Sequence, residues 1–109
     1  MNVVVRNSIP NKQGITQIFF ERQVQAFCPM GNDYYTAVVR VVMEPSNEIM
    51  DYCDTDNYIK SLGGKNLIIE DLVNEVFEHI EQYKPKYLRV SAKAESNVHF
   101  PVIVTKERK

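Results

Sequence analysis

Two side chains that flank one predicted turn could carry out covalent chemistry. Cys28 comes at the end of a β-type run and is followed by Pro29, and Asp33 follows across a dense turn signal. A cysteine thiolate is a nucleophile, and a nearby carboxyl group can transfer the proton that an addition step requires. Both residues also have a structural interpretation, because free cysteine is commonly a small buried hydrophobe and aspartate is common in turns.

Five further residues have types that occur in binding or catalytic sites. Glu70 falls in the first turn of a predicted helix, where the helix dipole favours a carboxylate whether or not a ligand is bound. Asp51 either begins a helical turn or contacts a ligand. Cys53 is interpreted as a spectator, and His79 and His99 as structural residues. Because no Cys or His spacing resembles a zinc site, no metal is expected.

Four segments have the composition or alternation of β-strands. Residues 15–28 and 34–43 are joined by the short turn and predict an antiparallel hairpin. Residues 87–94 alternate between apolar and polar side chains, which is typical of a strand with one buried face. Residues 98–105 form the fourth predicted strand, after a turn at residues 95–97, and Pro101 within it suits an edge position or a bulge.

Two helices separate the second predicted strand from the third. The first is short, begins near Asp54 or Thr55 and ends at the Gly63–Gly64 pair. The second is expected to begin at Asn66 and run to about residue 83. Its apolar residues recur at helical spacing and predict one buried stripe, formed by Ile69, Leu72, Val73, Val76, Ile80 and Tyr83.

This element order predicts an α+β domain in which two helices pack on one face of a four-stranded antiparallel sheet. Residues 1–14 are expected to form an extended lead-in, and residues 15–109 a single domain. The edges of such a sheet leave backbone groups unpaired, and joining copies edge to edge into a closed ring removes those edges. The sequence therefore predicts a homo-oligomer.

Composition restricts the classes of partner. The net charge of -1 gives no electrostatic reason for tight binding to nucleic acid, and the basic residues 106–109 are expected to form a solvated tail. No apolar run approaches the roughly 20 residues that span a bilayer, and the N-terminus lacks the pattern of a secretion signal. A cytoplasmic location with two reduced thiols is expected.

Three segments resemble a known family. Residues 27–35 read FCPMGNDYY, residues 69–74 read IEDLVN and residues 84–90 read KPKYLRV. Together with the element order, they resemble the tunnelling fold and, within it, the NADPH-dependent nitrile reductases that convert 7-cyano-7-deazaguanine to its aminomethyl form in queuosine biosynthesis, a tRNA-modification pathway. Subunits of this fold close into barrels with active sites at their interfaces.

The resemblance implies a role for each matching residue. Cys28 would form a covalent thioimide with the nitrile, Asp33 would transfer a proton, and Glu70 would hold the purine-like base. Ile69 stands where the family has a histidine. In the segment that contacts NADPH in the family, which aligns with residues 51–58, Asp51 is retained as a candidate ligand contact while both lysines are replaced. Three aspartates in that segment would repel the phosphates of a dinucleotide.

These matches and departures leave three hypotheses. The chain is a nitrile reductase that uses NADPH, or a relative that passes the thioimide to another nucleophile such as ammonia, as a family branch acting on tRNA does. The third hypothesis is a non-catalytic ring that binds a purine-like ligand or a partner protein. Formation of a covalent adduct at Cys28 would separate the first two hypotheses from the third.

Overall fold

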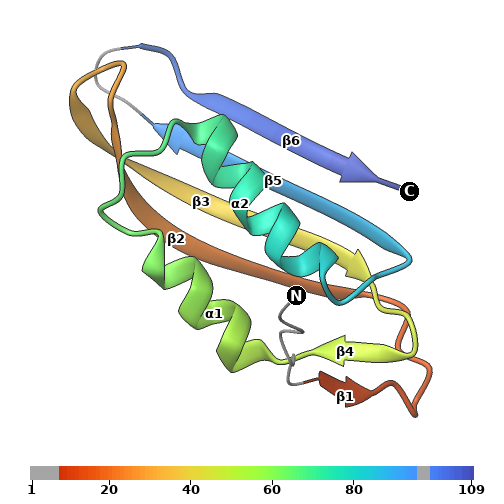
Figure 1. Cartoon of the computed structure of the whole chain (residues 1–109). Helices are drawn as coiled ribbons and strands as arrows, with labels where there is room; N and C mark the ends of the chain where they lie inside the picture. Colours follow the sequence, from red (N-terminus) through yellow and green to blue (C-terminus); the bar gives the residue numbers. More distant parts are fainter. Residues whose placement is uncertain (1–7, 96–98) are drawn as a thin grey trace.

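The long strands form one antiparallel sheet. The computed structural model describes residues 8–95 and 99–109. Strands β2 (Ile18–Cys28), β3 (Asp33–Glu44), β5 (Tyr87–Glu95) and β6 (Val102–Arg108) lie in the order β2-β3-β5-β6. Two helices, α1 (Tyr52–Ser61) and α2 (Ile69–Glu81), pack on one face of this sheet (Figure 1). The predicted α+β arrangement is confirmed.

The core lies between α2 and the sheet. Along β5 the predicted alternation is confirmed, because Leu88, Val90 and Ala92 are fully buried while Arg89 and Lys93 are exposed. The apolar stripe of α2 is buried as well, apart from Ile69, which is half-buried. Each large aliphatic side chain removed from water contributes roughly 1.5–3 kcal/mol. This shared burial fixes α2 over the centre of the sheet.

Helix α1 begins earlier than the sequence suggested. Asp51 is its N-cap, and the Asp51 carboxylate accepts the N–H of Asp54 at 3.0 Å. Asp54 and Thr55, the predicted caps, lie inside the first turn, and Thr55 is buried. Aspartate caps a helix by accepting an orphan backbone N–H, and each of several aspartates in this segment could do so. The predicted caps Asp54 and Thr55 are therefore wrong, whereas the interpretation of Asp51 as the start of a helical turn agrees with the structure.

Helix α2 begins at Ile69 and not at Asn66, and Ile68 caps it without a side-chain hydrogen bond. The residues before it are held extended against the end of β2. Phe27 donates its N–H to the Lys65 carbonyl at 3.0 Å and accepts the Leu67 N–H at 3.0 Å. These bonds form an isolated parallel bridge and delay the helix. A local capping rule cannot anticipate backbone pairing with a distant strand.

The last strand begins and ends later than predicted. Pro101 precedes β6, which starts at Val102 opposite Ala94. Proline has no N–H to give to a strand ladder, so pairing begins after it. The predicted turn and strand start at residues 96–98 lie outside the described residues. The expectation of a solvated basic tail is wrong for Lys106 and Arg108, because both lie in β6, and Arg108 pairs with Glu81 at 2.5 Å.

A small second sheet was not predicted. Strand β1 (Ser8–Pro10) pairs antiparallel with β4 (Glu48–Met50), with Ile9 opposite Ile49. Asn11 extends this ribbon by donating its backbone N–H to the Asn47 carbonyl at 2.8 Å. Part of the segment expected to be a lead-in is therefore paired with the chain, while the division into a lead-in and a single domain stays a prediction.

The face of the sheet away from the helices has a mixed composition. Phe19 on β2 and Ile103 on β6 are more than half exposed on the two edge strands, while Arg40 and Glu21 pair between β2 and β3. The edge strands β2 and β6 each have one side that pairs with no other described strand. Neither helix among residues 8–95 and 99–109 is long and apolar enough to cross a membrane.

Candidate functional site

One cavity lies where several connections meet at one end of the sheet. The β2–β3 turn, the start of α2 and the start of β6 come together at this end (Figure 1). Their residues line an open cavity of about 390 Å³, which is within the range of small-molecule sites. The walls combine apolar side chains with a few polar ones, namely Cys28, Asp33, Tyr34, Glu70 and His99. The cavity therefore combines mostly apolar walls with a few polar groups, as small-molecule sites do.

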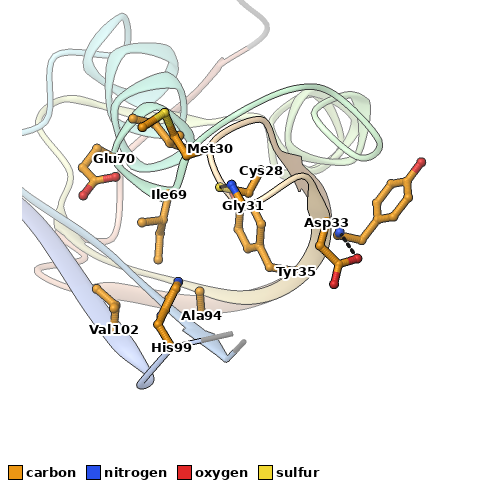
Figure 2. Close-up of a pocket in the computed structure, with 12 residues that line it drawn as sticks. Cys28, Met30, Gly31, Asp33, Tyr35, Ile69, Glu70, Ala94, His99 and Val102 are labelled. Carbon is orange, nitrogen blue, oxygen red and sulfur yellow. Dashed lines mark hydrogen bonds between the residues drawn. The ribbon is translucent and has the colours of Figure 1, made fainter. Parts of the chain in front are cut away.

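Cys28 is half-buried and its sulfur faces this cavity (Figure 2). Its position is set by the hairpin, since Cys28 is the last residue of β2 and pairs with Asp33, the first of β3. The N–H of Gly31 donates to the Cys28 Sγ at 3.4 Å, and Asn32 closes the turn with a φ of 53°. The backbone dipole of Gly31 is therefore directed at the sulfur, where negative charge develops when a thiol reacts.

The bridge between β2 and the segment before α2 brings Cys28 and Glu70 to the same cavity. Phe27, next to Cys28, exchanges two backbone hydrogen bonds with residues 65 and 67. Tyr35 on β3 reinforces this bridge, because its hydroxyl donates to the Leu67 carbonyl at 2.5 Å. Glu70 follows in the first turn of α2 with an exposed carboxylate. Two residues far apart in the sequence thus lie in one site.

Tyr35 is the buried floor of this site. Burial raises its pKa to about 12, with additional contributions from the Cys28 thiolate, Glu70 and Asp71. The phenol therefore stays protonated and keeps donating to the Leu67 carbonyl throughout the neutral range. Because the hydroxyl is committed to this backbone contact, Tyr35 acts on the site by holding the start of α2 in place.

Asp33 lines the cavity, but its carboxylate does not face the sulfur. Its Oδ1 accepts the N–H of Tyr34 at 2.7 Å. In Figure 2 the Asp33 carboxylate is directed away from Cys28, beyond Tyr35. The structure thus brings Asp33 and Cys28 together as strand partners without directing the acid at the nucleophile.

Asp51 is not among the residues that line this cavity. It is half-buried, and its carboxylate is occupied as the N-cap of α1. A second surface hollow lies next to it, between the start of β2 and α1, and Cys53 is among its lining residues. The structure therefore does not gather the four predicted site residues in one place, since Cys28, Asp33 and Glu70 share a cavity and Asp51 lies elsewhere.

His99 lines the cavity although the sequence favoured a structural role for it. In Figure 2 its ring projects from the connection between β5 and β6 toward Ile69, on the wall facing Cys28. The side chain is exposed, and its Nδ1 lies 2.6 Å from the Phe100 carbonyl oxygen. No local motif marks this histidine, because it reaches the site only through the pairing of β6 with β5.

The segment that would meet the phosphates of NADPH does not fit them. Asp51 caps α1, Asp54 accepts the Tyr83 hydroxyl at 3.0 Å, and Asp56 lies 2.8 Å from Arg22. The cation Arg22 is thus already paired with a carboxylate. None of the described residues that line the cavity is a lysine or an arginine. Phosphates need unpaired cations or a cradle of N–H groups. In the described part of the chain, the cations next to the acidic segment, Arg22 and Lys60, are both paired with Asp56.

The described ranges, residues 8–95 and 99–109, hold no group of three His, Cys, Asp or Glu side chains arranged to bind a metal ion. The two cysteines of the described chain are both free thiols, and Cys53 is exposed. The walls of the cavity carry a thiol, two carboxylates, two phenols and an imidazole.

Comparison with solved structures identifies the fold. No family model and no curated protein matches the sequence. An archaeosine synthase, QueF-Like, in the apo form superimposes with a TM-score of 0.77 at 18% identity, over 84% of this chain and 92% of that one. Escherichia coli dihydroneopterin aldolase in complex with neopterin superimposes with a TM-score of 0.65 at 17% identity, over 85% and 98% of the two chains.

Both similar structures are enzymes of the tunnelling-fold type, and at this level of identity they establish the fold alone. This chain has the tunnelling fold, with the four-stranded antiparallel sheet and two helices that the sequence predicted. These similarities assign no activity to this chain.

Proposed function

We propose that this protein is an enzyme in which Cys28 forms a covalent thioimide with the nitrile of a 7-cyano-7-deazaguanine-type base. The observation that carries the proposal is the shared cavity of Cys28 and Glu70, which the bridge between Phe27 and residues 65–67 brings together. A thiol that faces a cavity of about 390 Å³ beside a carboxylate has the parts for covalent capture of a flat polar ligand.

Glu70 would bind the base. An ionised carboxylate has only acceptor sites, and a guanine-like edge presents neighbouring N–H donors that two carboxylate oxygens can accept together. Ile68, Ile69 and Val102 line the same cavity and offer apolar surface to the ring faces. In the addition, the Cys28 sulfur bonds to the nitrile carbon, one C–N π bond breaks, and the thiol proton moves to the nitrogen. The resemblance of the sequence to nitrile reductases assigns the transfer of this proton to Asp33.

We favour a nitrogen nucleophile such as ammonia as the second reactant. Ammonia would add to the thioimide carbon, the C–S bond would break, and an amidine and the free thiol would result. The acidic segment from Asp51 to Asp56 and the absence of cations among the described lining residues support this choice over NADPH. Reduction by NADPH to the aminomethyl product, which the sequence resemblance implies, is the alternative fate of the same adduct.

The adduct is tested by intact mass. Incubation with 7-cyano-7-deazaguanine should raise the mass of the protein by the full mass of the ligand, because addition to a nitrile has no leaving group. Cys28→Ala should abolish the shift, and Cys53→Ala, which removes the other free thiol, should retain it. Loss of the shift in Cys53→Ala instead would contradict the assignment.

The fate of the adduct is tested by adding each second reactant. Decay of the adduct with ammonia to an amidine would support the favoured reaction, and decay that requires oxidation of NADPH would support the reductase instead. Reversible binding of the base with no covalent adduct in the wild-type protein would favour the non-catalytic ring and overturn the enzymatic proposal.

A further inference from the structure

The addition of a thiol to a nitrile needs a group that moves a proton from sulfur to nitrogen, and besides Asp33 the cavity holds an imidazole, that of His99. We propose that His99 is this catalytic residue, accepting the proton from Cys28 and delivering it to the nitrile nitrogen. The inference rests on the proposed function, and it concerns a residue for which the sequence patterns favoured a structural role.

The geometry of the cavity supports this assignment. Cys28 and His99 lie on facing walls of one cavity, and the His99 ring is directed into it (Figure 2). Asp33, the alternative acid, has its carboxylate turned outward and bonded to the Tyr34 N–H at 2.7 Å. Glu70 is needed for the N–H donors of the base. Among the described lining residues, His99 is the one imidazole.

The tautomer of His99 follows from its hydrogen bond. Its Nδ1 lies 2.6 Å from the carbonyl oxygen of Phe100. Because a carbonyl oxygen can only accept, Nδ1 must carry the proton in the neutral ring and donate it. The second ring nitrogen, Nε2, then has its lone pair exposed and can act as a base. The Phe100 carbonyl thus prepares His99 to take a proton from a thiol.

The proton balance of the step is complete without a further reactant. Nε2 takes the proton from the Cys28 thiol as the C–S bond forms, so the sulfur attacks as a thiolate and the imidazole becomes an imidazolium. One C–N π bond breaks, and the imidazolium returns the same proton to the nitrogen that receives the electron pair. The ring is neutral before and after the step.

The test uses chemical rescue in a Cys53→Ser background, so that Cys28 is the reacting thiol. The rate of adduct formation with 7-cyano-7-deazaguanine is followed by intact mass. His99→Ala should slow it by about 100-fold or more, the usual contribution of a positioned acid–base group. Free imidazole in the buffer should restore much of the rate. Because His99 is exposed, its truncation should leave the fold intact.

Two variants serve as comparisons. Thr105→Ala changes an exposed residue of β6, the strand that follows His99, outside the cavity, and should react at the wild-type rate with no response to imidazole. Asp33→Asn should slow the reaction far less than His99→Ala. A larger loss in Asp33→Asn, or a loss in His99→Ala that imidazole does not restore, would overturn the role of His99 and leave the proposed function standing.

Alkylation of Cys28 by iodoacetamide tests the role of His99 separately from the proposed function. This reaction needs the same removal of a proton from sulfur but no recognition of the base. Slower alkylation in His99→Ala that imidazole restores would support the proton-accepting role of His99. This would hold even if 7-cyano-7-deazaguanine gave no adduct, and in that case the proposed function alone would fail. Equal alkylation rates in the wild-type protein and His99→Ala would overturn the inference.

Discussion

At the scale of single residues, the site depends on a tyrosine that does no chemistry itself. Tyr35 is 8% exposed, and its hydroxyl holds the Leu67 carbonyl, two residues before α2 begins. Glu70 is in the first turn of that helix. The position of Glu70 at the cavity therefore depends in part on the hydrogen bond between Tyr35 and Leu67.

Removal of this hydroxyl should weaken the fold. In Tyr35→Phe the partly buried Leu67 carbonyl loses its phenolic donor, so we expect a loss of about 1–2 kcal/mol in the free energy of unfolding, measured by urea denaturation at neutral pH. Adduct formation at Cys28 should slow as well, since Glu70 becomes less well fixed. A variant as stable as the wild-type protein would show that the hydrogen bond contributes no net stability.

The pH dependence of this effect has a definite sign. The folded-state pKa of Tyr35 lies near 12, above the ordinary value of 10.0, mainly because the side chain is buried. The stability that depends on the protonated phenol is complete below pH 10 and is lost as the pH rises from about 10 to about 12. The stability advantage of the wild-type protein over Tyr35→Phe should shrink across this interval.

Other tyrosines do not obscure the comparison. Burial and Glu75 raise the pKa of Tyr58, and a hydrogen bond to Glu107 raises the pKa of Tyr87. Both titrate in the wild-type protein and in Tyr35→Phe alike. The difference between the two stability curves therefore isolates Tyr35, and parallel curves up to pH 12 would contradict the assignment.

At the scale of elements, Asp51 illustrates how one residue type supports two interpretations. The sequence resemblance made it a ligand contact, whereas in the structure its carboxylate caps α1. We expect Asp51→Ala to lower the free energy of unfolding by about 1 kcal/mol through loss of the cap. Asp51→Asn keeps an acceptor for the Asp54 N–H and should unfold like the wild-type protein, as measured by thermal or urea denaturation.

The same pair of variants tests the binding role. If Asp51 only caps α1, both variants should form the Cys28 adduct at the wild-type rate, because Asp51 lies outside the cavity. A strong loss of adduct formation in Asp51→Asn, with stability unchanged, would restore the interpretation as a ligand contact.

The fold could be predicted from the sequence where a pattern acts locally. The alternation in β5 and the apolar stripe in α2 each indicate which side of the element faces the core. The strands, the helices and their packing could therefore be predicted from hydrophobic periodicity. The start of α2 and the β1–β4 ribbon depend on backbone bonds between distant segments, and no local pattern encodes them.

The site was predictable to a similar extent. Cys28, Asp33 and Glu70 share the expected cavity because they border the turn and the helix start that motif reasoning located. The sequence did not predict His99 as a site residue, because its position depends on how β6 pairs with β5. The sequence predicts both strands but not which of their residues lie opposite each other. The direction of the Asp33 carboxylate is likewise set by its hydrogen bond to Tyr34 and not by spacing along the chain.

At the scale of the whole molecule, the chain is more elongated than a compact domain. Its radius of gyration is 14.7 Å and its extents are 47 × 29 × 21 Å. A compact chain of this length would have a radius of about 13 Å. The long strands account for the difference, since the sheet extends beyond the two helices and leaves its edges β2 and β6 without a neighbouring strand (Figure 1).

We propose that copies of the chain join these edges to form a ring, as the sequence analysis predicted. Native mass spectrometry should then detect a closed homo-oligomer. Ile103 is 65% exposed on β6, so Ile103→Asp should place a charge at the junction and lower the oligomeric mass while leaving thermal unfolding of the subunit nearly unchanged. A monomer at micromolar concentration in the wild-type protein would contradict the proposal.

The position of the cavity at one end of the strands has a consequence for such a ring. In a cyclic assembly every copy points the same way along the symmetry axis. All the cavities would then open along a single rim, next to the junctions where β6 of one copy meets β2 of the next. Reactants would approach every thiol from one side of the ring, and the opposite rim would remain clear of chemistry.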